Sequence, residues 1–134
     1  MGANSEAGLN RKFVEFAKLL NIYLNHFPKH EKFALANLIR TTAYEIYDAI
    51  TEGQKRYHKK TTLSNLDIAH EKLRMQLHLA NELGYFRYKD GRDDEDDAAE
   101  TARRRYLAIS AMVDELGAMI GGCIKKMKDE NKWQ

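Results

Sequence analysis

Four stretches of the chain repeat apolar residues at intervals of three and four positions, which is the spacing of one face of an α-helix. The first stretch covers about residues 9–27 and ends at Pro28, which cannot donate the next helical hydrogen bond. Because proline suits the first turn of a helix, we expect the second helix to begin at once and to cover about residues 29–59. The other two helices are expected over about residues 62–86 and 98–128.

Each stretch has one apolar face, as expected for helices that pack around a shared core. Short connections favour antiparallel neighbours, so the pattern predicts an all-α, antiparallel up-down four-helix bundle that takes in residues 1–134 as a single domain. The predicted core faces consist of Phe13, Phe16, Ala17, Leu20, Leu24 and Phe27 in the first helix, of Leu35, Leu38, Ile39, Thr42, Ala43, Ile46, Ala49 and Ile50 in the second, of Leu63, Leu66, Ala69, Leu73, Leu77, Ala80 and Leu83 in the third, and of Tyr106, Ile109, Met112, Val113, Leu116, Ile120 and Ile124 in the fourth.

The fourth predicted helix is thin, because small residues recur along it. Gly117, Gly121 and Gly122 fall close together, and a glycine destabilises a helix by about 1 kcal/mol relative to alanine. Small side chains let a neighbouring backbone approach closely, and such packing would offset the loss. We therefore expect these three glycines at a contact between subunits.

Composition narrows the class of protein. The chain has 134 residues, of which 43% are hydrophobic and 31% charged, a globular composition rather than a disordered one. No unbroken apolar run approaches the roughly 20 residues of a membrane span, and the N-terminal residues show no secretory signal. The single cysteine, Cys123, excludes an internal disulfide and a cysteine-based zinc site. We expect a cytoplasmic protein that does not associate with membranes.

Charge is distributed unevenly along the chain. The segment 89–100 holds seven acidic and two basic residues, a net charge of −5. Because the whole chain has a net charge of +2, the remaining residues carry +7. Acids in residues 89–97 repel one another and have little apolar surface to bury, which predicts an acidic loop. A basic body with one acidic insertion favours an anionic partner.

The densest basic cluster lies between the second and third predicted helices. Lys55, Arg56, Lys59 and Lys60 surround Tyr57, and such a cluster can neutralise phosphates while the aromatic ring stacks on a base. Cations also complement the C-terminal end of a helix dipole, and a turn is solvated in any case. Both interpretations stay open for this cluster.

Two further basic groups are candidates for nucleic-acid binding. The third predicted helix carries Lys72, Arg74 and His78, of which the last two share a face because they are four residues apart. For these residues a solvated flank is the alternative interpretation. The other group, Arg103, Arg104 and Arg105, opens the fourth helix, where cations oppose the helix dipole. Either the neighbouring acids or a bound partner would offset this placement.

The sequence does not support an enzyme or a metal centre. A carboxylate-bridged metal site in a bundle needs Glu-x-x-His pairs on two helices, and here only Asp67 and His70 have this spacing. The acidic loop does not match a calcium-binding loop. A phosphate-cradling glycine loop and a nucleophile elbow are also missing from the sequence, so we expect no enzymatic activity, no metal and no cofactor.

Three short stretches resemble a known family of four-helix-bundle proteins. They are Phe-Pro-Lys-His-Glu-Lys-Phe at 27–33, Ala-Tyr-Glu-Ile at 43–46, and Val-Asp-Glu-Leu-Gly-Ala-Met-Ile-Gly-Gly-Cys-Ile-Lys at 113–125. The family includes proteins encoded by 23S rRNA intervening sequences and the accessory variability determinant (Avd) of diversity-generating retroelements. The last stretch looks especially like Avd, and the resemblance spans about residues 19–126.

The resemblance implies a specific function. Avd proteins are non-enzymatic, form a barrel-shaped homopentamer, and bind the reverse transcriptase and template-repeat RNA of their element to support mutagenic cDNA synthesis. In the family, basic residues of the third helix are among those implicated in binding, and the matching positions here are Arg74 and His78. The alternative is an intervening-sequence-type bundle that acts as a protein-interaction scaffold, in which case the basic clusters are solvated surface.

Overall fold

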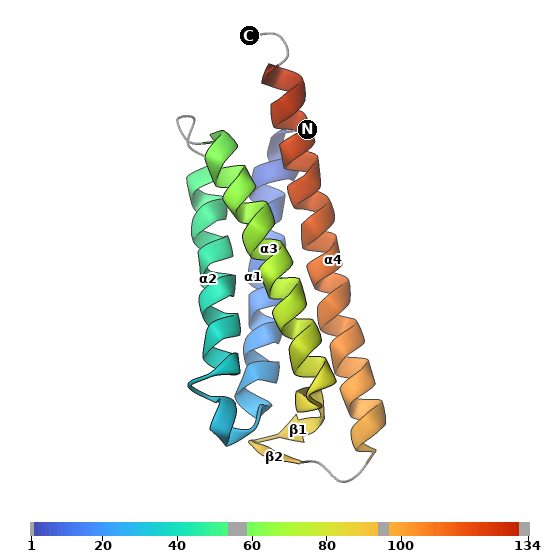
Figure 1. Cartoon of the computed structure of the whole chain (residues 1–134). Helices are drawn as coiled ribbons and strands as arrows, with labels where there is room; N and C mark the ends of the chain where they lie inside the picture. Colours follow the sequence, from blue (N-terminus) through green and yellow to red (C-terminus); the bar gives the residue numbers. More distant parts are fainter. Residues whose placement is uncertain (1, 54–58, 94–96, 132–134) are drawn as a thin grey trace.

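The computed structural model describes residues 2–53, 59–93 and 97–131, and these form an antiparallel bundle of four α-helices (Figure 1). The helices are α1 (Gly2–His26), α2 (Leu35–Gly53), α3 (Lys59–Glu82) and α4 (Ala98–Asn131). They run alternately down and up in the view of Figure 1, and α4 packs against both α1 and α3. The predicted all-α up-down bundle is confirmed.

One apolar core runs along the axis of the bundle and draws on all four helices. The predicted stripes supply most of it, with two exceptions: Leu38 and Leu83 are about half exposed. The largest fully buried side chains are Phe13, Phe16, Phe86, Ile39, Ile46, Leu66, Leu73, Leu77, Ile109, Leu116, Ile120 and Val113.

The connection between α1 and α2 is longer than the sequence predicts. Pro28 ends α1, as expected, but Lys29–Glu31 form only a 3₁₀ turn, η1, and α2 begins at Leu35. The Glu31 carboxylate accepts a hydrogen bond of 3.0 Å from the Leu35 N–H. Because the first amides of a helix have no partner within it, this contact caps α2 and fixes its start. The prediction of a helix from residue 29 is therefore wrong.

The helix boundaries at the upper end also differ from the prediction. The expected second helix reaches residue 59, whereas α2 ends at Gly53 and α3 begins at Lys59 instead of residue 62. Residues 54–58 between them lie outside the described part of the chain. At the other end α3 stops at Glu82, four residues early, because Gly84 takes a left-handed conformation with φ of 80°, which suits glycine and ends a helix.

A small hairpin replaces part of the predicted acidic loop. After the 3₁₀ turn η3 (Tyr85–Arg87), strand β1 (Tyr88–Lys89) pairs antiparallel with β2 (Arg92–Asp93) at the lower end of the bundle (Figure 1). The turn residues Asp90 and Gly91 both have positive φ, 53° and 79°. An Asp-Gly pair is favoured in this two-residue turn, so the sequence carried a hairpin signal that a count of acidic residues conceals. Residues 94–96 of the expected loop lie outside the described part.

The hairpin turn is docked on the C-terminal end of α1. The backbone N–H of Asp90 donates to His26 Nδ1 at 3.0 Å, and that of Gly91 donates to the His26 carbonyl at 3.2 Å. The second bond satisfies one of the helix's terminal carbonyls, which accept no hydrogen bond within the helix. The turn thus closes the lower end of the bundle across a sequence separation of 64 residues.

A buried histidine sets the spacing between α3 and α4. His70 Nε2 lies 2.8 Å from the Val113 carbonyl oxygen, and the imidazole fills the space left by Gly117. A Cβ at Gly117 would stand 2.7 Å from His70 Cε1, closer than real contacts allow. Gly117 is therefore required within the subunit, while a Cβ at Gly121 or Gly122 would meet nothing within 4 Å.

We predict that Gly117→Ala lowers the free energy of unfolding by about 1–3 kcal/mol, the usual effect of overpacking a core. Gly122→Ala is the matched control. In the separate subunit it is expected to raise the free energy of unfolding by about 1 kcal/mol, because alanine is the better helix former and a Cβ there meets nothing within 4 Å. Urea denaturation of dilute protein measures both. Equal stability of the two variants would show that the His70 contact does not determine helix spacing.

Candidate nucleic-acid interface

The densest predicted basic cluster lies at the upper end of the bundle. Lys55 and Arg56 fall outside the described residues, so the structure does not place them. Lys59 and Lys60 open α3, and the side chain of Lys60 is exposed. At 1.5 Å per residue the 24 residues of α3 span about 36 Å. This length separates Lys59 and Lys60 from the arginines that open α4 at the lower end.

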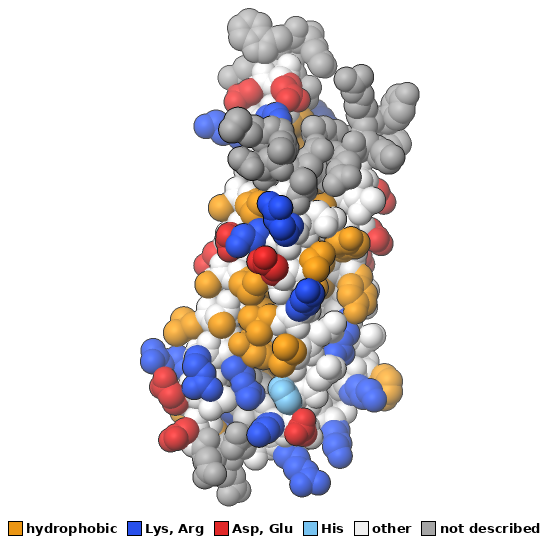
Figure 2. Space-filling view, turned by 180° about the vertical axis from the view of Figure 1, so that it is seen from behind, with side chains coloured by type: hydrophobic (Ala, Val, Ile, Leu, Met, Phe, Trp, Pro, Cys, Tyr) orange, Lys and Arg blue, Asp and Glu red, His pale blue; other side chains and the backbone are white. Residues whose placement is uncertain are grey.

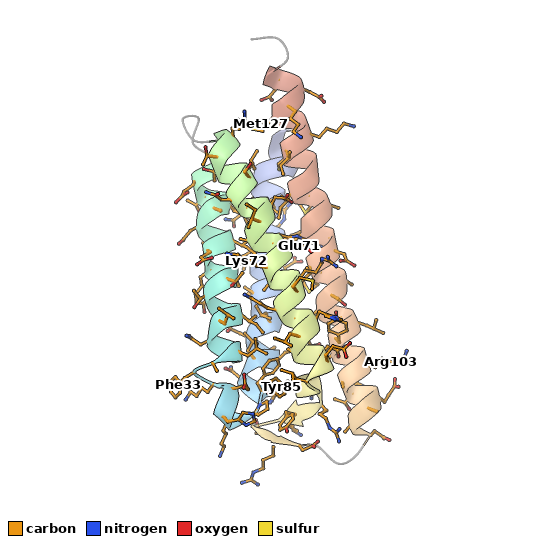
Figure 3. All side chains as sticks on the ribbon, viewed as in Figure 1. Phe33, Glu71, Lys72, Tyr85, Arg103 and Met127 are labelled. Carbon is orange, nitrogen blue, oxygen red and sulfur yellow. The ribbon has the colours of Figure 1, made fainter. Side chains whose placement is uncertain are left out.

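The three candidates on α3 do not share a face. Lys72 lies on the side of α3 toward α2, whereas Glu71 lies on the side toward α4 (Figure 3). Arg74 donates to Glu71 from Nε and Nη2, at 3.1 and 2.5 Å, and this hydrogen bonding holds the pKa of the Glu71 carboxyl below its usual value. His78 Nε2 is 3.9 Å from Glu82. Arg74 and His78 are thus exposed but each has a carboxylate neighbour.

The three arginines that open α4 point in different directions, because successive helical residues are about 100° apart. Arg103 points away from the bundle (Figure 3) and lies 3.4 Å from Glu100. Arg104 is exposed, and no hydrogen bond joins it to another described residue. Arg105 turns inward, where Nη1 donates to the carbonyls of Phe86 and Tyr88 at 3.1 and 2.7 Å. Arg105 therefore ties the η3 segment and the hairpin to α4.

The lower end carries a basic group that the sequence pattern does not reveal. Figure 2 shows Lys and Arg side chains gathered at this end of the face seen from behind. The cations that line the two pockets at this end come from segments distant in sequence: they are Lys29, Lys32, Arg40, Lys89 and Arg92. Only folding brings them together, because α1, η1, α2 and the hairpin meet there. The local sequence offers only the close spacing of Lys29 and Lys32 as a sign of this group. Both residues lie in the stretch 27–33, which is interpreted through its resemblance to the family and not as a basic cluster.

Two exposed apolar faces lie on different helices of the bundle, α3 and α4. On α3, Ile68, Met75, Leu79 and Leu83 are each about half exposed and recur at helical spacing around Lys72. We call these four residues, with Leu38 of α2, the large-residue face. On α4 the exposed residues Leu107, Ala111, Ala118, Gly121 and Gly122 form the small-residue face.

The small-residue face belongs to an apolar stretch of α4. Between Arg105 and Lys125 this helix has two charged residues, Asp114 and Glu115. The most apolar part of α4 has a mean hydropathy of 1.6, and by length and composition it could cross a membrane; 28% of this part is buried in the bundle. Core helices of soluble proteins can have the same length and composition. The prediction from unbroken apolar runs missed this part because the two acids interrupt it. Its outward residues offer an apolar surface for a contact.

An ion pair on the opposite flank of α4 joins it to α1. Lys12 Nζ is 3.0 Å from Glu115 Oε1, and its hydrogen bond to Glu115 raises the pKa of Lys12 above its usual value. Glu115 is thereby used within the subunit. Asp114 falls at helical spacing with the small-residue face, and within the subunit its charge adds, after that of Glu71, to the rise of the Arg74 pKa. Within residues 2–53, 59–93 and 97–131, His, Cys, Asp and Glu side chains form no group of three that would hold a metal ion.

The family model of bAvd-like proteins matches residues 9–127. The chain belongs to the bAvd-like family. Searches of curated proteins and of solved structures gave no match. Membership of the family indicates an accessory role in a diversity-generating retroelement, and it confirms the resemblance drawn from the three short stretches.

The match covers the elements that build both ends of the Avd-like bundle. It begins at Leu9 within α1 and ends at Met127 within α4, so the η1 turn, the hairpin and both exposed apolar faces fall inside it. The family assignment therefore rests on parts of all four helices rather than on one helix pair.

We predict that Arg105→Gln lowers the free energy of unfolding by roughly 1–3 kcal/mol, because two part-buried carbonyls are deprived of a charged donor. Arg104→Gln removes the same charge from an exposed position and is expected to change stability by less than about 0.5 kcal/mol. Thermal denaturation of both variants distinguishes the structural arginine from the solvent-facing one. A destabilised Arg104→Gln with an unchanged Arg105→Gln would contradict this assignment.

Proposed function

We propose that the chain is a non-enzymatic accessory subunit of a diversity-generating retroelement that binds the reverse transcriptase and the template-repeat RNA and so supports mutagenic cDNA synthesis. The observation that carries the proposal is the family match over residues 9–127. Cationic groups at both ends of the bundle support it, because Lys and Arg side chains bind RNA by displacing counterions from phosphates.

Assembly into a closed ring is part of the proposal. The large-residue face and the small-residue face are different surfaces on different sides of one subunit. A contact between two unlike faces is heterologous; repeated from copy to copy it closes a ring when the rotation between neighbours divides a full turn, and it forms an open filament otherwise. Protruding leucine, isoleucine and methionine side chains fit a neighbour whose surface is lined by glycine and alanine. Five copies is the number that the family resemblance implies.

One charged residue stands within each of the two apolar faces. Lys72 lies among Ile68, Met75 and Leu79, and Asp114 lies between Ala111 and Ala118. Their charges are opposite, so pairing the two faces would bring a cation to an anion in the middle of an apolar contact. Electrostatic complementarity of this kind fixes the register of an interface and rejects wrong partners. Lys72, a candidate for RNA binding from sequence, is assigned to the subunit contact in this arrangement.

We predict that Lys72→Glu and Asp114→Lys each dissociate the assembly, because each places like charges face to face in the contact. The double variant restores opposite charges and is expected to recover the assembled mass. Light scattering measures the mass of each variant, and circular dichroism checks that each is folded. Recovery in the double variant alone supports the paired faces, whereas an assembled Lys72→Glu would contradict them.

Reversal of the basic cluster at the upper end tests the RNA-binding part. Changing Lys55, Arg56, Lys59 and Lys60 to glutamate is expected to weaken binding of template-repeat RNA. It should also flatten the dependence of log Kd on log salt, by roughly 0.7 for each phosphate that the variant no longer neutralises. Fluorescence anisotropy at several salt concentrations gives both quantities. An unchanged salt slope would remove this cluster from the interface.

Co-purification with the element's reverse transcriptase tests the accessory role itself. The full chain is expected to hold the polymerase with template-repeat RNA, and light scattering with and without RNA at two salt concentrations reports the assembled state. A monomer or dimer that ignores both RNA and polymerase would instead favour the intervening-sequence-type scaffold.

A further inference from the structure

A pocket of about 400 Å³ opens at the lower end of the bundle, between the end of α1, the η1 turn and the start of α2. Leu24 and Phe27 form its apolar floor, Asn25 and Gly91 complete the wall, and Lys29, Lys32 and Arg40 supply cations. Among the described residues, Asp90 is the one acid that lines it. Three cations around one concave site of this size favour an anionic group such as a phosphate.

Arg40 is held in this pocket by neutral partners, so no carboxylate among the described residues compensates its positive charge. Its Nε donates to Asn21 Oδ1 at 3.0 Å and its Nη2 donates to Asn25 Oδ1 at 2.5 Å. Both acceptors are neutral amides, whereas Arg74, Arg87 and Arg103 each contact a carboxylate. The two asparagines of α1 therefore hold the guanidinium in place and leave its positive charge available to a ligand.

Lys29 connects this pocket with a second one. Its aliphatic chain lies over the Asp90–Gly91 turn, so close that a Cβ at Gly91 would stand 2.8 Å from Lys29 Cγ. On the other side of Lys29 a pocket of about 420 Å³ is lined by Lys89, Arg92, Asp90 and Asp93. The Asp93 carboxylate is 2.7 Å from Arg87 Nε. The two pockets thus form a basic track across the end of the bundle, with Lys29 in the middle.

An exposed aromatic ring stands beside the track. Phe33 is 85% exposed, the most exposed large hydrophobic side chain among the described residues, and it projects from the outer edge of the lower end (Figure 3). Lys32 Nζ lies 5.5 Å from the centre of its ring. An aromatic face next to cations is the arrangement by which proteins bind single-stranded nucleic acid, with bases stacked on rings and phosphates on cations.

We infer that the lower end is a binding site for single-stranded RNA, with a backbone phosphate held by Arg40, Lys29 and Lys32 and an unpaired base stacked on Phe33. The identity of the polymer rests on the proposed function, whereas the phosphate pocket follows from the residues described above. In a duplex the bases are stacked on one another, so no base is free to stack on Phe33. The site should therefore bind a duplex more weakly than a single strand.

Asp90 works against the ligand in this site. Its backbone N–H donates to His26 Nδ1 at 3.0 Å, which fixes the turn on the end of α1. The Asp90 carboxylate, 78% exposed and 3.3 Å from the same nitrogen, brings a negative charge to the lining of the pocket. Asparagine tolerates the positive φ of this turn position equally well. Asp90→Asn therefore removes a repulsive charge and keeps the turn, so it should tighten RNA binding.

The test uses the full chain and a short single-stranded RNA that carries a fluorescent base analogue, alone or paired with its complement. Arg40→Gln is expected to weaken single-strand binding about ten-fold and to flatten the salt slope by roughly 0.7. Phe33→Leu is expected to weaken single-strand binding on the order of ten-fold and to abolish the fluorescence change caused by stacking. Phe33→Tyr is expected to retain both the affinity and the fluorescence change. Asp90→Asn is expected to bind more tightly, and Lys18→Gln, an exposed charge loss on α1, is the matched control.

Three results would overturn the inference: Arg40→Gln and Phe33→Leu that bind like Lys18→Gln, a preference of the unaltered chain for the duplex, or a Phe33→Leu variant that changes only the assembled mass. The proposed function has a separate outcome. Binding of single strands that depends on Arg40 and Phe33, without capture of the reverse transcriptase, would contradict the accessory role and leave this site standing. Absence of any RNA binding by the unaltered chain would overturn both.

Discussion

The contact between the Asp90–Gly91 turn and His26 is the constraint on which the lower end of the molecule depends. A four-helix bundle has open ends, where terminal amides and carbonyls of the helices lack partners. The hairpin supplies donors to the last residue of α1, and Arg105 ties the same segment to α4 through two carbonyls. Lys29 then lies on the turn. These contacts hold the hairpin, the end of α1 and the start of α4 together, and so they fix the backbone that carries the cationic side chains.

The helices were predictable because burial of one apolar stripe per helix decides the fold. Residues such as Phe16, Ile46, Leu73 and Ile120 repeat at helical spacing and all lie in the core. Leu38 has the same spacing yet is half exposed. The pattern of one chain cannot tell an inner stripe from a flank that faces another subunit or solvent, because both are apolar.

The ends were harder to predict because they depend on local backbone chemistry and on distant contacts. The cap from Glu31 to Leu35 moves the start of α2, and the positive φ of Gly84 ends α3 early. Arg105 looked equivalent to Arg103 and Arg104 in sequence, and only the packing of η3 against α4 makes it structural. Arg40 is the reverse case, since its role comes from two asparagines fifteen and nineteen residues earlier.

The proposed division between sides and ends of the bundle has a consequence for affinity. Side faces used for subunit contacts leave both ends free, and a ring whose bundle axes lie along its own axis presents every copy of the Arg40 pocket on one rim. A single pocket with three cations binds weakly, but a flexible strand already held at one copy meets the next at a high effective concentration. Salt dependence grows with each phosphate engaged. Assembly through Lys72 and Asp114 would thus govern RNA binding without either residue touching RNA.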